Sequence, residues 1–212
     1  MRTSNTALAV ALAALAALAS PLCRHDDAVA AEAKLGIFGG AGWAAPLAGS
    51  VSDSHGSGPM LRLGLALTGE SFGGSLGLGA YRDEASLSHP AFVESAKSTL
   101  LWLPIALEAN YRMPEADRSP YASLGLELWV LREAFEYRIN GSNEKADGNR
   151  TALAGVLGVG YELRDTAFPL RFGGRLSLAS MERQTLTSEG TVLTTGSNRT
   201  AAYLSIGVEA EW

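Results

Sequence analysis

Residues 101–112 read L-W-L-P-I-A-L-E-A-N-Y-R, with large apolar residues at every odd position from Leu101 to Leu107. The even positions of the same stretch include the charged residues Glu108 and Arg112. Side chains of a β-strand alternate between its two faces, so this pattern predicts a strand with one apolar face and one mixed face. The same period of two continues along the chain from Lys34, and no helical period competes with it.

The period of two divides the chain into eight runs, each long enough to cross a bilayer, for which a tilted strand needs about 9–11 residues. The predicted strands are Lys34–Ala45, Pro59–Thr68, Phe72–Glu84, Lys97–Met113, Ser119–Tyr137, Asn149–Arg164, Pro169–Thr187 and Arg199–Trp212.

The connections between these runs alternate between short and long. Three are tight, at Gly69-Glu70, Pro114–Arg118 and Asp165–Phe168. Four are long and polar, at Ser50–Gly58, Ala85–Ala96, Ile139–Gly148 and Ser188–Asn198. This asymmetry is typical of transmembrane β-barrels, which have short turns on one side and longer loops on the other. The sequence therefore predicts an all-β protein, an eight-stranded antiparallel up-and-down transmembrane β-barrel.

Length and charge exclude several other classes. The chain has 212 residues and a mass of 22.2 kDa, which suits a single domain. Beyond the N-terminus no apolar stretch approaches the ~20 residues of a membrane helix. The formal net charge of −5 offers no basic excess for a nucleic-acid partner.

Residues 1–30 are expected to form a cleaved export signal, with the mature barrel domain spanning residues 31–212. Arg2 supplies the positive start, and Ala7–Ala19 has the length of a signal h-region. Cleavage after Ala19 and cleavage after Ala30 both fit a small-x-small site. The only cysteine, Cys23, lies in this segment, so cleavage after Ala30 leaves a mature chain without thiols.

The apolar face has two possible environments, a soluble core or lipid. A soluble lipocalin-like barrel needs a polar outer face, but here the second face is mostly Gly, Ala and Ser with a few charges. Such small residues suit a narrow lumen. An exposed leucine belt in water would far exceed the apolar patch that a monomer tolerates. We therefore expect the leucine face to contact lipid.

Aromatic residues of outward parity provide a separate test, since they are expected at the membrane interfaces. Trp43 has outward parity at one rim of the predicted barrel. Five others collect at the opposite, periplasmic rim and form a predicted aromatic girdle: Phe72, Tyr111, Tyr161, Phe172 and Trp212.

The end of the chain, L-S-I-G-V-E-A-E-W, alternates apolar residues up to a terminal aromatic. It resembles the C-terminal insertion signal of the small eight-stranded outer-membrane β-barrel family of Gram-negative bacteria. The resemblance implies an outer-membrane location, lipid and lipopolysaccharide as surroundings, and the barrel-assembly machinery as a partner during insertion. The residues that carry the signal are Leu204, Ile206, Val208, Ala210 and Trp212.

Nine charged residues have inward parity and are expected to form a charge network in the lumen. They are Arg62, Glu108, Arg112, Glu127, Glu162, Arg171, Arg175, Glu209 and Glu211. Four basic and five acidic residues suggest mutual pairing, and arginine can bond both oxygens of a carboxylate. The predicted registers place Glu162 opposite Arg171, and Arg175 opposite Glu209. The network either plugs and stiffens the barrel or lines a narrow water path.

Few residues offer catalytic or metal chemistry. Outside the predicted signal, the histidines are His55 and His89, both in predicted loops and expected to be solvated. Ser88 beside His89 is the one candidate for a nucleophile and base. We expect no cofactor, no metal and no enzymatic activity.

Glycine and proline inside the predicted strands suggest local irregularities. Gly39-Gly40 and Gly73-Gly74 are expected at bends or bulges rather than in phosphate-binding loops. Pro104 cannot donate to a strand ladder, so a bulge is expected there. Asn140-Gly141-Ser142 is expected to mark a turn.

The fifth and seventh predicted strands continue past membrane height, through Arg132–Tyr137 and Met181–Thr187. Such a projecting edge can bind a partner by strand addition. We therefore expect a monomeric, non-enzymatic barrel with both termini in the periplasm and a structural or adhesin-like role at the cell surface. A small channel for ions or apolar solutes and a lipid A modifying enzyme are the alternatives.

Overall fold

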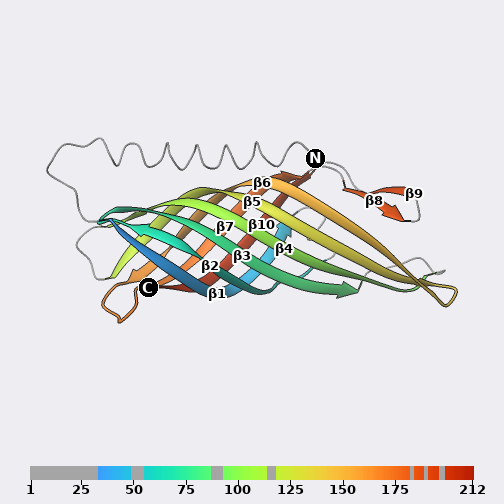
Figure 1. Ribbon diagram of the computed structural model, residues 1–212, viewed down its shortest axis with the longest axis horizontal. Helices are drawn as coiled ribbons and strands as arrows, with labels where there is room; N and C mark the ends of the chain where they lie inside the picture. Colours follow the sequence, from blue (N-terminus) through green and yellow to red (C-terminus); the bar gives the residue numbers. More distant parts are fainter. Residues whose placement is uncertain are drawn as a thin grey trace.

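The computed structural model describes residues 33–48, 55–86, 93–113, 118–181, 184–188, 191–195 and 199–212, so the predicted signal lies outside them. Eight antiparallel strands close into a barrel in the order β1-β10-β7-β6-β5-β4-β3-β2, as Figure 1 shows. The eight-stranded antiparallel barrel is thus confirmed. In the described part of the chain, no helix has the length and hydropathy needed to cross a membrane. The barrel strands are β1 (Lys34–Ala48), β2 (Gly58–Thr68), β3 (Phe72–Ser86), β4 (Val93–Arg112), β5 (Arg118–Ile139), β6 (Ser142–Leu163), β7 (Leu170–Met181) and β10 (Arg199–Glu211).

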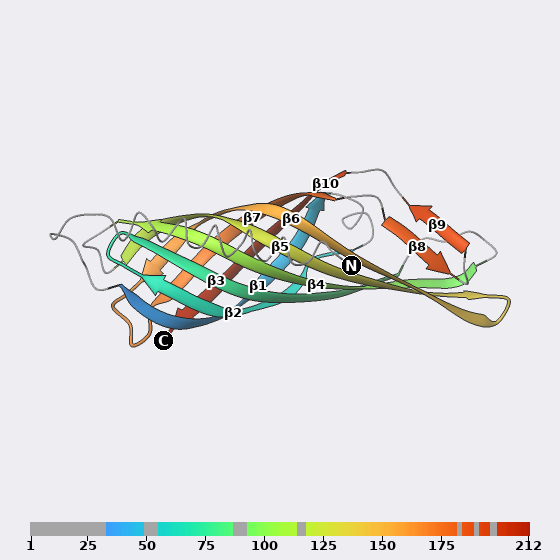
Figure 2. The ribbon, with the colours of Figure 1, turned by 45° about the horizontal axis from the view of Figure 1, so that its top comes forward.

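The two ends of the barrel differ. At one end, which we call the turn end, the Gly69 N–H donates to the Phe72 carbonyl across 3.0 Å and closes the β2–β3 turn. The β6–β7 turn over residues 165–168 and the C-terminal residue lie at the same end (Figure 2). At the opposite loop end, β4, β5 and β6 extend well beyond the other strands (Figures 1 and 2).

The alternation in sequence becomes an apolar outer face and a filled interior. On the outer face Leu35 is 73% exposed and Leu61 is 64% exposed, whereas inward-facing Phe38 and Val156 are buried. A fold that exposes its leucines and buries its small and polar residues is stable when lipid rather than water surrounds the outer face.

The predicted polar loop at residues 139–148 is wrong, because these residues form a hairpin. Strands β5 and β6 stay paired up to Ile139 and Ser142. Only Asn140 and Gly141 turn, with φ of 49° and 79°. Positive φ at both central residues defines the turn type that Asn-Gly favours. Asn140-Gly141 therefore marks a turn as expected, and the hairpin leaves no room for a loop.

The predicted seventh strand is wrong beyond Met181. Barrel strand β7 ends there, and residues 184–188 form β8 (Gln184–Ser188), which pairs outside the barrel with β9 (Thr191–Thr195). Part of the predicted loop 188–198 is therefore a strand. The predicted continuation of the fifth strand through Arg132–Tyr137 is correct, and the strands that extend with it are β4 and β6 rather than β7.

The bulge expected at Pro104 is absent. The pairs Leu78–Ile105 and Tyr81–Trp102 keep one register on either side of it. The proline ring fits because Gly79 faces it, where a Cβ would lie 2.8 Å from the Pro104 Cγ. In the described strands, register shifts occur instead between Pro46 and Ala48 and between Val93 and Ser95. The glycine pairs at residues 39–40 and 73–74 lie within stretches of unbroken register, so neither pair forms a bulge.

The outer face can be tested with a charge at mid-height. Leu157→Arg puts an arginine on the lipid side of β6, where Leu157 is 55% exposed. We expect the free energy of unfolding in lipid vesicles to fall by about 2–4 kcal/mol, the cost of a cation at the bilayer midplane. Ser142→Arg, at the exposed tip of the same strand, is the control and should change it by less than about 1 kcal/mol. Equal effects of the two variants in a denaturant titration would contradict a lipid-facing belt.

Candidate functional site

The interior of the barrel is filled by four groups of side chains, stacked from the turn end to the loop end. The first is a charged group at the turn end. Arg112 Nη1 donates to both carboxylate oxygens of Glu162, each at 2.9 Å, and Arg112 Nη2 donates to the Gly69 carbonyl at 2.5 Å. Arg171 lies 3.5 Å from Glu162 and 2.8 Å from Glu211. These bonds tie β4, β6, β7 and β10 to the β2–β3 turn.

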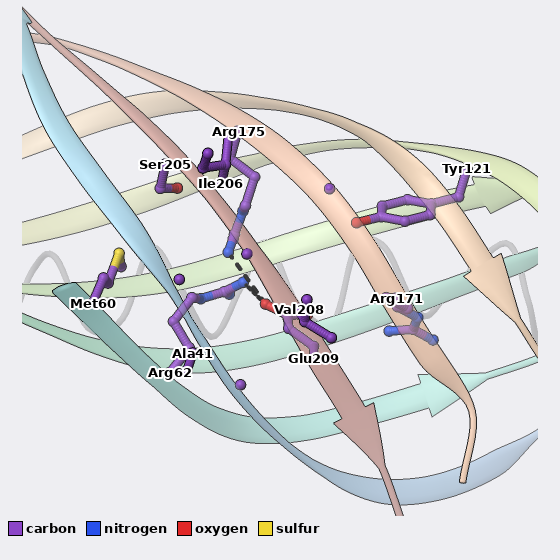
Figure 3. A pocket seen from close by; sticks show the side chains of 14 residues that line it. Ala41, Met60, Arg62, Tyr121, Arg171, Arg175, Ser205, Ile206, Val208 and Glu209 are labelled. Carbon is purple, nitrogen blue, oxygen red and sulfur yellow. Dashed lines mark hydrogen bonds and ion pairs between the residues drawn. The ribbon is translucent and has the colours of Figure 1, made fainter. Parts of the chain in front are cut away.

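The second group lies at mid-height and joins strands on different sides of the barrel. Arg62 of β2 pairs with Glu209 of β10 and, at 3.3 Å, with Glu108 of β4. Arg175 of β7 pairs with Glu108 and lies 3.7 Å from Glu209 and 4.0 Å from Glu127. Figure 3 shows Arg62 and Arg175 converging on Glu209.

The structure therefore brings all nine predicted lumen charges together on the inner face, in these two groups. Their burial requires pairing, because an isolated charge in a confined site costs several kcal/mol. Glu108, Arg112, Glu127 and Glu162 are each at most 5% exposed.

One of the two predicted registers is correct. Glu162 lies opposite Arg171, which confirms that prediction. Arg175 lies opposite Ser205, and Glu209 lies opposite Arg171, so the second prediction is wrong. The prediction assumed that the pairs of the last two barrel strands are symmetric about Val192. The observed pairs, such as Met181 with Arg199, are symmetric about a position two residues earlier in the chain. Arg175 nevertheless reaches Glu209 diagonally on the neighbouring strand, because its long side chain spans the four-residue offset.

A small cavity remains beside the mid-height group. It has a volume of about 30 Å³ and is lined in part by Arg62, Tyr121, Arg171 and Arg175. This volume exceeds the about 10–15 Å³ that a cavity needs to hold one water molecule. Gly173 leaves room for the Tyr121 hydroxyl beside the cavity, because a Cβ at this position would lie 2.3 Å from that oxygen.

The third group is an aromatic layer above the charges, formed by Tyr81, Trp102, Trp129 and Tyr203. Each of these side chains is at most 1% exposed. The ring centroids of Trp102 and Tyr203 lie 4.2 Å apart, and those of Trp129 and Tyr203 lie 4.9 Å apart. Since β4 and β10 are on opposite sides of the barrel, the Trp102–Tyr203 contact spans the lumen.

The aromatic layer and the mid-height charges are linked by a hydrogen bond. The Trp129 Nε1–H donates to the Glu127 carboxylate at 2.8 Å, which supplies Glu127 with a donor in addition to the distant Arg175. Within the described residues, the Trp102 indole N–H and the Tyr203 hydroxyl have no hydrogen-bond partner. The layer is thus held mainly by ring packing.

The fourth group is a polar cluster that covers the loop-end side of the aromatic layer and is centred on His55. His55 Nδ1 lies 3.2 Å from Asp83 Oδ2, and His55 Nε2 lies 3.1 Å from Ser98 Oγ. Ser98 also donates to Glu133 at 3.2 Å, and Glu133 accepts from Arg150 at 2.7 Å. The residues of this His55 cluster come from β3, β4, β5, β6 and the segment that precedes β2.

His55 is therefore buried, which overturns its prediction as a solvated loop residue; it is 4% exposed. Two backbone contacts fix the same segment: the Gly56 N–H donates to Asp83 at 3.0 Å, and Tyr81 donates to the Gly56 carbonyl at 2.6 Å. His89 and Ser88 lie outside the described residues.

The order Asp83–His55–Ser98 has the distances of a hydrolase triad. Its environment differs from that of a nucleophile, however. Ser98 is fully buried, and its hydroxyl also bonds to the Glu133 carboxylate, which would repel a developing oxyanion. Within the described residues, no group of three or more His, Cys, Asp or Glu side chains could hold a metal ion. The cluster is suited to anchoring the segment at residues 55–57 rather than to catalysis.

The five aromatic residues predicted as a girdle lie on the outer face at the turn end. They are between 41% and 60% exposed. Phe72 lies opposite Tyr111, with ring centroids 5.1 Å apart, and Tyr161 lies opposite Phe172. Trp212 packs near Phe168, at 6.2 Å. Trp43 is on the outer face of β1, on the loop-end side, and is 50% exposed.

The last strand has the alternation that the sequence analysis described. Leu204, Ile206 and Val208 face outward and are 38–58% exposed, and Ala210 shares their parity. Trp212 is held to β1 by hydrogen bonds in both directions with Ile37, of 2.9 and 2.8 Å. The final residue therefore helps to close the barrel.

Sequence reasoning missed the aromatic layer and the His55 cluster. The parity of Trp102 and Trp129 already placed both inward, beside Glu108 and Glu127, and this signal could have revealed the layer. No such signal exists for His55, because the path of a loop does not follow from strand periodicity.

Comparisons with known proteins agree with this architecture. A family model described as outer membrane protein beta-barrel domain matches residues 6–175. No curated protein sequence matches the chain.

Similar solved structures include Neisserial surface protein A (NspA), at 18% identity and a TM-score of 0.47, covering 85% of this chain and 99% of that one. Ail, the attachment invasion locus protein of Yersinia pestis, has 10% identity, a TM-score of 0.41 and coverages of 85% and 99%. A major outer membrane protein from Thermus thermophilus has 12% identity, a TM-score of 0.48 and coverages of 82% and 99%. At these identities the neighbours do not define a ligand or an activity.

The buried charge group at the turn end can be tested by removing one partner. Arg112→Ala leaves Glu162, only 2% exposed, without its two-oxygen contact. Arg171 and Arg164 remain 3.5 Å from Glu162, so we expect a loss of about 1.5–3 kcal/mol in the free energy of unfolding, typical of a lost hydrogen-bonded contact to a buried charge. The control is Arg118→Ala, which breaks the exposed pair with Asp165 and should cost less than about 1 kcal/mol. A similarly small loss for Arg112→Ala would contradict a structural role for the group.

The His55 cluster predicts protection of the backbone that it anchors. His55→Ala removes the contacts to Asp83 and Ser98, so the Gly56 amide should exchange its hydrogen with solvent at least about tenfold faster, as expected for the loss of about 1.4 kcal/mol of local stability. Amide exchange of Gly125, in the β4–β5 ladder at mid-height, should stay unchanged and serves as the internal control. Unchanged exchange at Gly56 would show that His55 does not hold this segment.

Proposed function

Since the chain belongs to the outer membrane protein beta-barrel domain family and lies in the bacterial outer membrane, we propose that it is a closed, non-enzymatic barrel with a structural or adhesin-like role at the cell surface. The observation that carries this proposal is the filled lumen. Two groups of charges, the aromatic layer and the His55 cluster occupy it at four successive heights.

A closed lumen favours a surface role over a channel. The Trp102–Tyr203 contact leaves no continuous polar lining between the charge groups and the loop end. Ions crossing this layer would lose their hydration against rings that offer few polar atoms, which is costly. The paired charges below it add a second barrier.

Burial of Ser98 and His55 also disfavours the lipid A modifying alternative. A catalytic site of that kind needs its nucleophile open to an acyl chain from the outer leaflet. Mass spectrometry of lipid A from cells with and without the protein tests this point, and a changed acyl pattern would establish an enzyme.

The extension of β4, β5 and β6 at the loop end is the surface best suited to a partner. Its outer side carries charged residues in cross-strand neighbours, Lys97, Glu136 and Lys145, and Lys145 donates to Glu136 at 2.6 Å. This bond holds the pKa of Glu136 below its usual value. The opposite side continues the inward parity with Phe135. A stiff, two-faced projection of this kind suits contact with another surface.

The proposal also covers the outward aromatic residues, the last strand and the oligomeric state. The outward rings at the turn end would sit at the periplasmic interface, with both termini in the periplasm. The last strand, through Trp212, would be read by the barrel-assembly machinery during insertion. We propose that the folded protein is monomeric, because a closed barrel has no free edge within the membrane.

A planar bilayer tests the closed lumen. We expect no steady single-channel conductance from the wild-type protein. Trp102→Ala combined with Tyr203→Ala removes the cross-lumen contact and should raise the frequency of openings. The control is Tyr111→Ala, which removes an outward ring. Stable openings of the wild-type protein would favour the channel alternative.

The surface role is tested by shortening the projection. Replacing residues 136–145 with Asn-Gly keeps the hairpin turn and removes the end of the extension. If the proposal is right, cells that display the shortened protein should bind host-cell or matrix surfaces less than cells that display the full chain. Leu157→Ala, on the lipid side, is the control. Equal binding of all three cell types, at equal surface expression, would argue for a purely structural role.

A further inference from the structure

The first outward-facing charges above the apolar belt are arginines on two strands that flank β4. Arg82 of β3 lies opposite Leu101 of β4, and Leu101 lies opposite Arg132 of β5. Both arginines are exposed, and Arg82 is 67% exposed. Four residues from Leu101 toward the loop end, Lys97 of β4 is also exposed.

The height of this row can be estimated from the aromatic residues at the turn end. Arg82 is ten positions along β3 from Phe72, and Leu101 is ten positions along β4 from Tyr111. A tilted strand rises roughly 2.6 Å per residue along the barrel axis, so the row lies about 26 Å above these rings. This matches the apolar band of an outer-membrane barrel, which is about 25 Å tall. The two arginines thus lie where the hydrocarbon ends and the outer-leaflet headgroups begin.

No acidic side chain competes on the membrane side of this row. Between the turn end and the row, the described outward positions of β3, β4, β5 and β6 carry no charge other than Arg118 at the turn end. The acids lie on the loop-end side. Glu84 bonds to Arg82 at 2.5 Å, and Glu136 bonds to Lys145 at 2.6 Å. An anion held at the top of the belt therefore meets the arginines first.

Both arginines have N–H groups that are available to bind a ligand. Arg82 uses one Nη for Glu84, which leaves most of its five N–H groups. Among the described residues, Arg132 makes no ion pair. Across β4 the two strands are roughly 10 Å apart, so both guanidinium groups can approach one headgroup above Leu101. Planar guanidinium groups suit phosphate because they can bond two of its oxygens at once.

From this juxtaposition we propose that Arg82 and Arg132, with Lys97 behind them, form a binding site for the phosphate groups of an outer-leaflet glycolipid. The acyl chains of the bound lipid lie along the leucine face of β3, β4 and β5, over Leu78 and Ile105. The site is separate from the lumen and does not depend on whether the loop-end extension binds a partner.

Native mass spectrometry of the full folded protein in detergent with bisphosphorylated lipid A tests the site. The wild-type protein should retain a lipid A adduct, and Arg82→Ala combined with Arg132→Ala should lower the bound fraction at least about tenfold, as for the loss of a charge-assisted contact. The matched control is Arg118→Ala, because Arg118 is 66% exposed at the opposite interface and should not matter. Heat-dependent gel mobility checks that each variant is folded.

Three outcomes would overturn the proposal. They are a wild-type protein that retains no lipid A, a double variant that retains as much as the wild type, and equal retention of dephosphorylated lipid A, which would show binding by apolar contact alone. Displacement of the lipid by millimolar inorganic phosphate is a fourth such outcome, because it would show a site for a simple ion rather than for a lipid. None of these results bears on conductance or on surface binding, so they are distinct from a failure of the proposed function.

Discussion

Every backbone N–H and C=O group within the hydrocarbon must find a partner in the protein, and the closed ladder of eight strands is how this chain meets that requirement. Closure of β1 against β10 fixes the diameter of the barrel, and the diameter fixes how much space the lumen has. With eight strands this space is only as wide as the side chains that fill it. The inner face must then hold residues whose sizes and charges fit one another.

This constraint explains the layering of the interior. Long arginine side chains reach carboxylates two or more strands away, as Arg175 does to Glu108, so charge pairs bridge the lumen in addition to joining neighbouring strands. Where no counter-charge is available, rings fill the width instead, as Trp102 and Tyr203 do. At the loop end the backbone no longer needs to be closed, and a loop residue, His55, enters to complete the packing.

The sequence predicted strand number, the direction of each face and the inward set of charges, because all three follow from a period of two. It could not predict side-chain pairs between strands that are not neighbours, such as Arg175 of β7 with Glu108 of β4, since these depend on tilt and register. The prediction of a loop at residues 139–148 was wrong because it relied on their polarity. Polar residues near Asn140-Gly141 suggested a loop, but outside the membrane a hairpin can be polar on its exposed side. His55 shows the same limit for a loop, whose path is set by tertiary contacts alone.

A lumen committed to structural contacts leaves the outer surface to carry function, and that surface is not uniform around the barrel. Strands β3 to β6 hold both the arginine row above the belt and the projecting extension, while the described side chains of β1, β2, β7 and β10 include no charge at an outward position. A lipid phosphate bound at Arg82 and Arg132 would lie at the base of the extension, on the strands that form it. Contacts between the lipid and the base of the extension would limit how far the extension can tilt. Lipid binding on this side of the barrel would thus hold the β4–β6 extension at a fixed angle to the membrane and present its two faces consistently to whatever it meets.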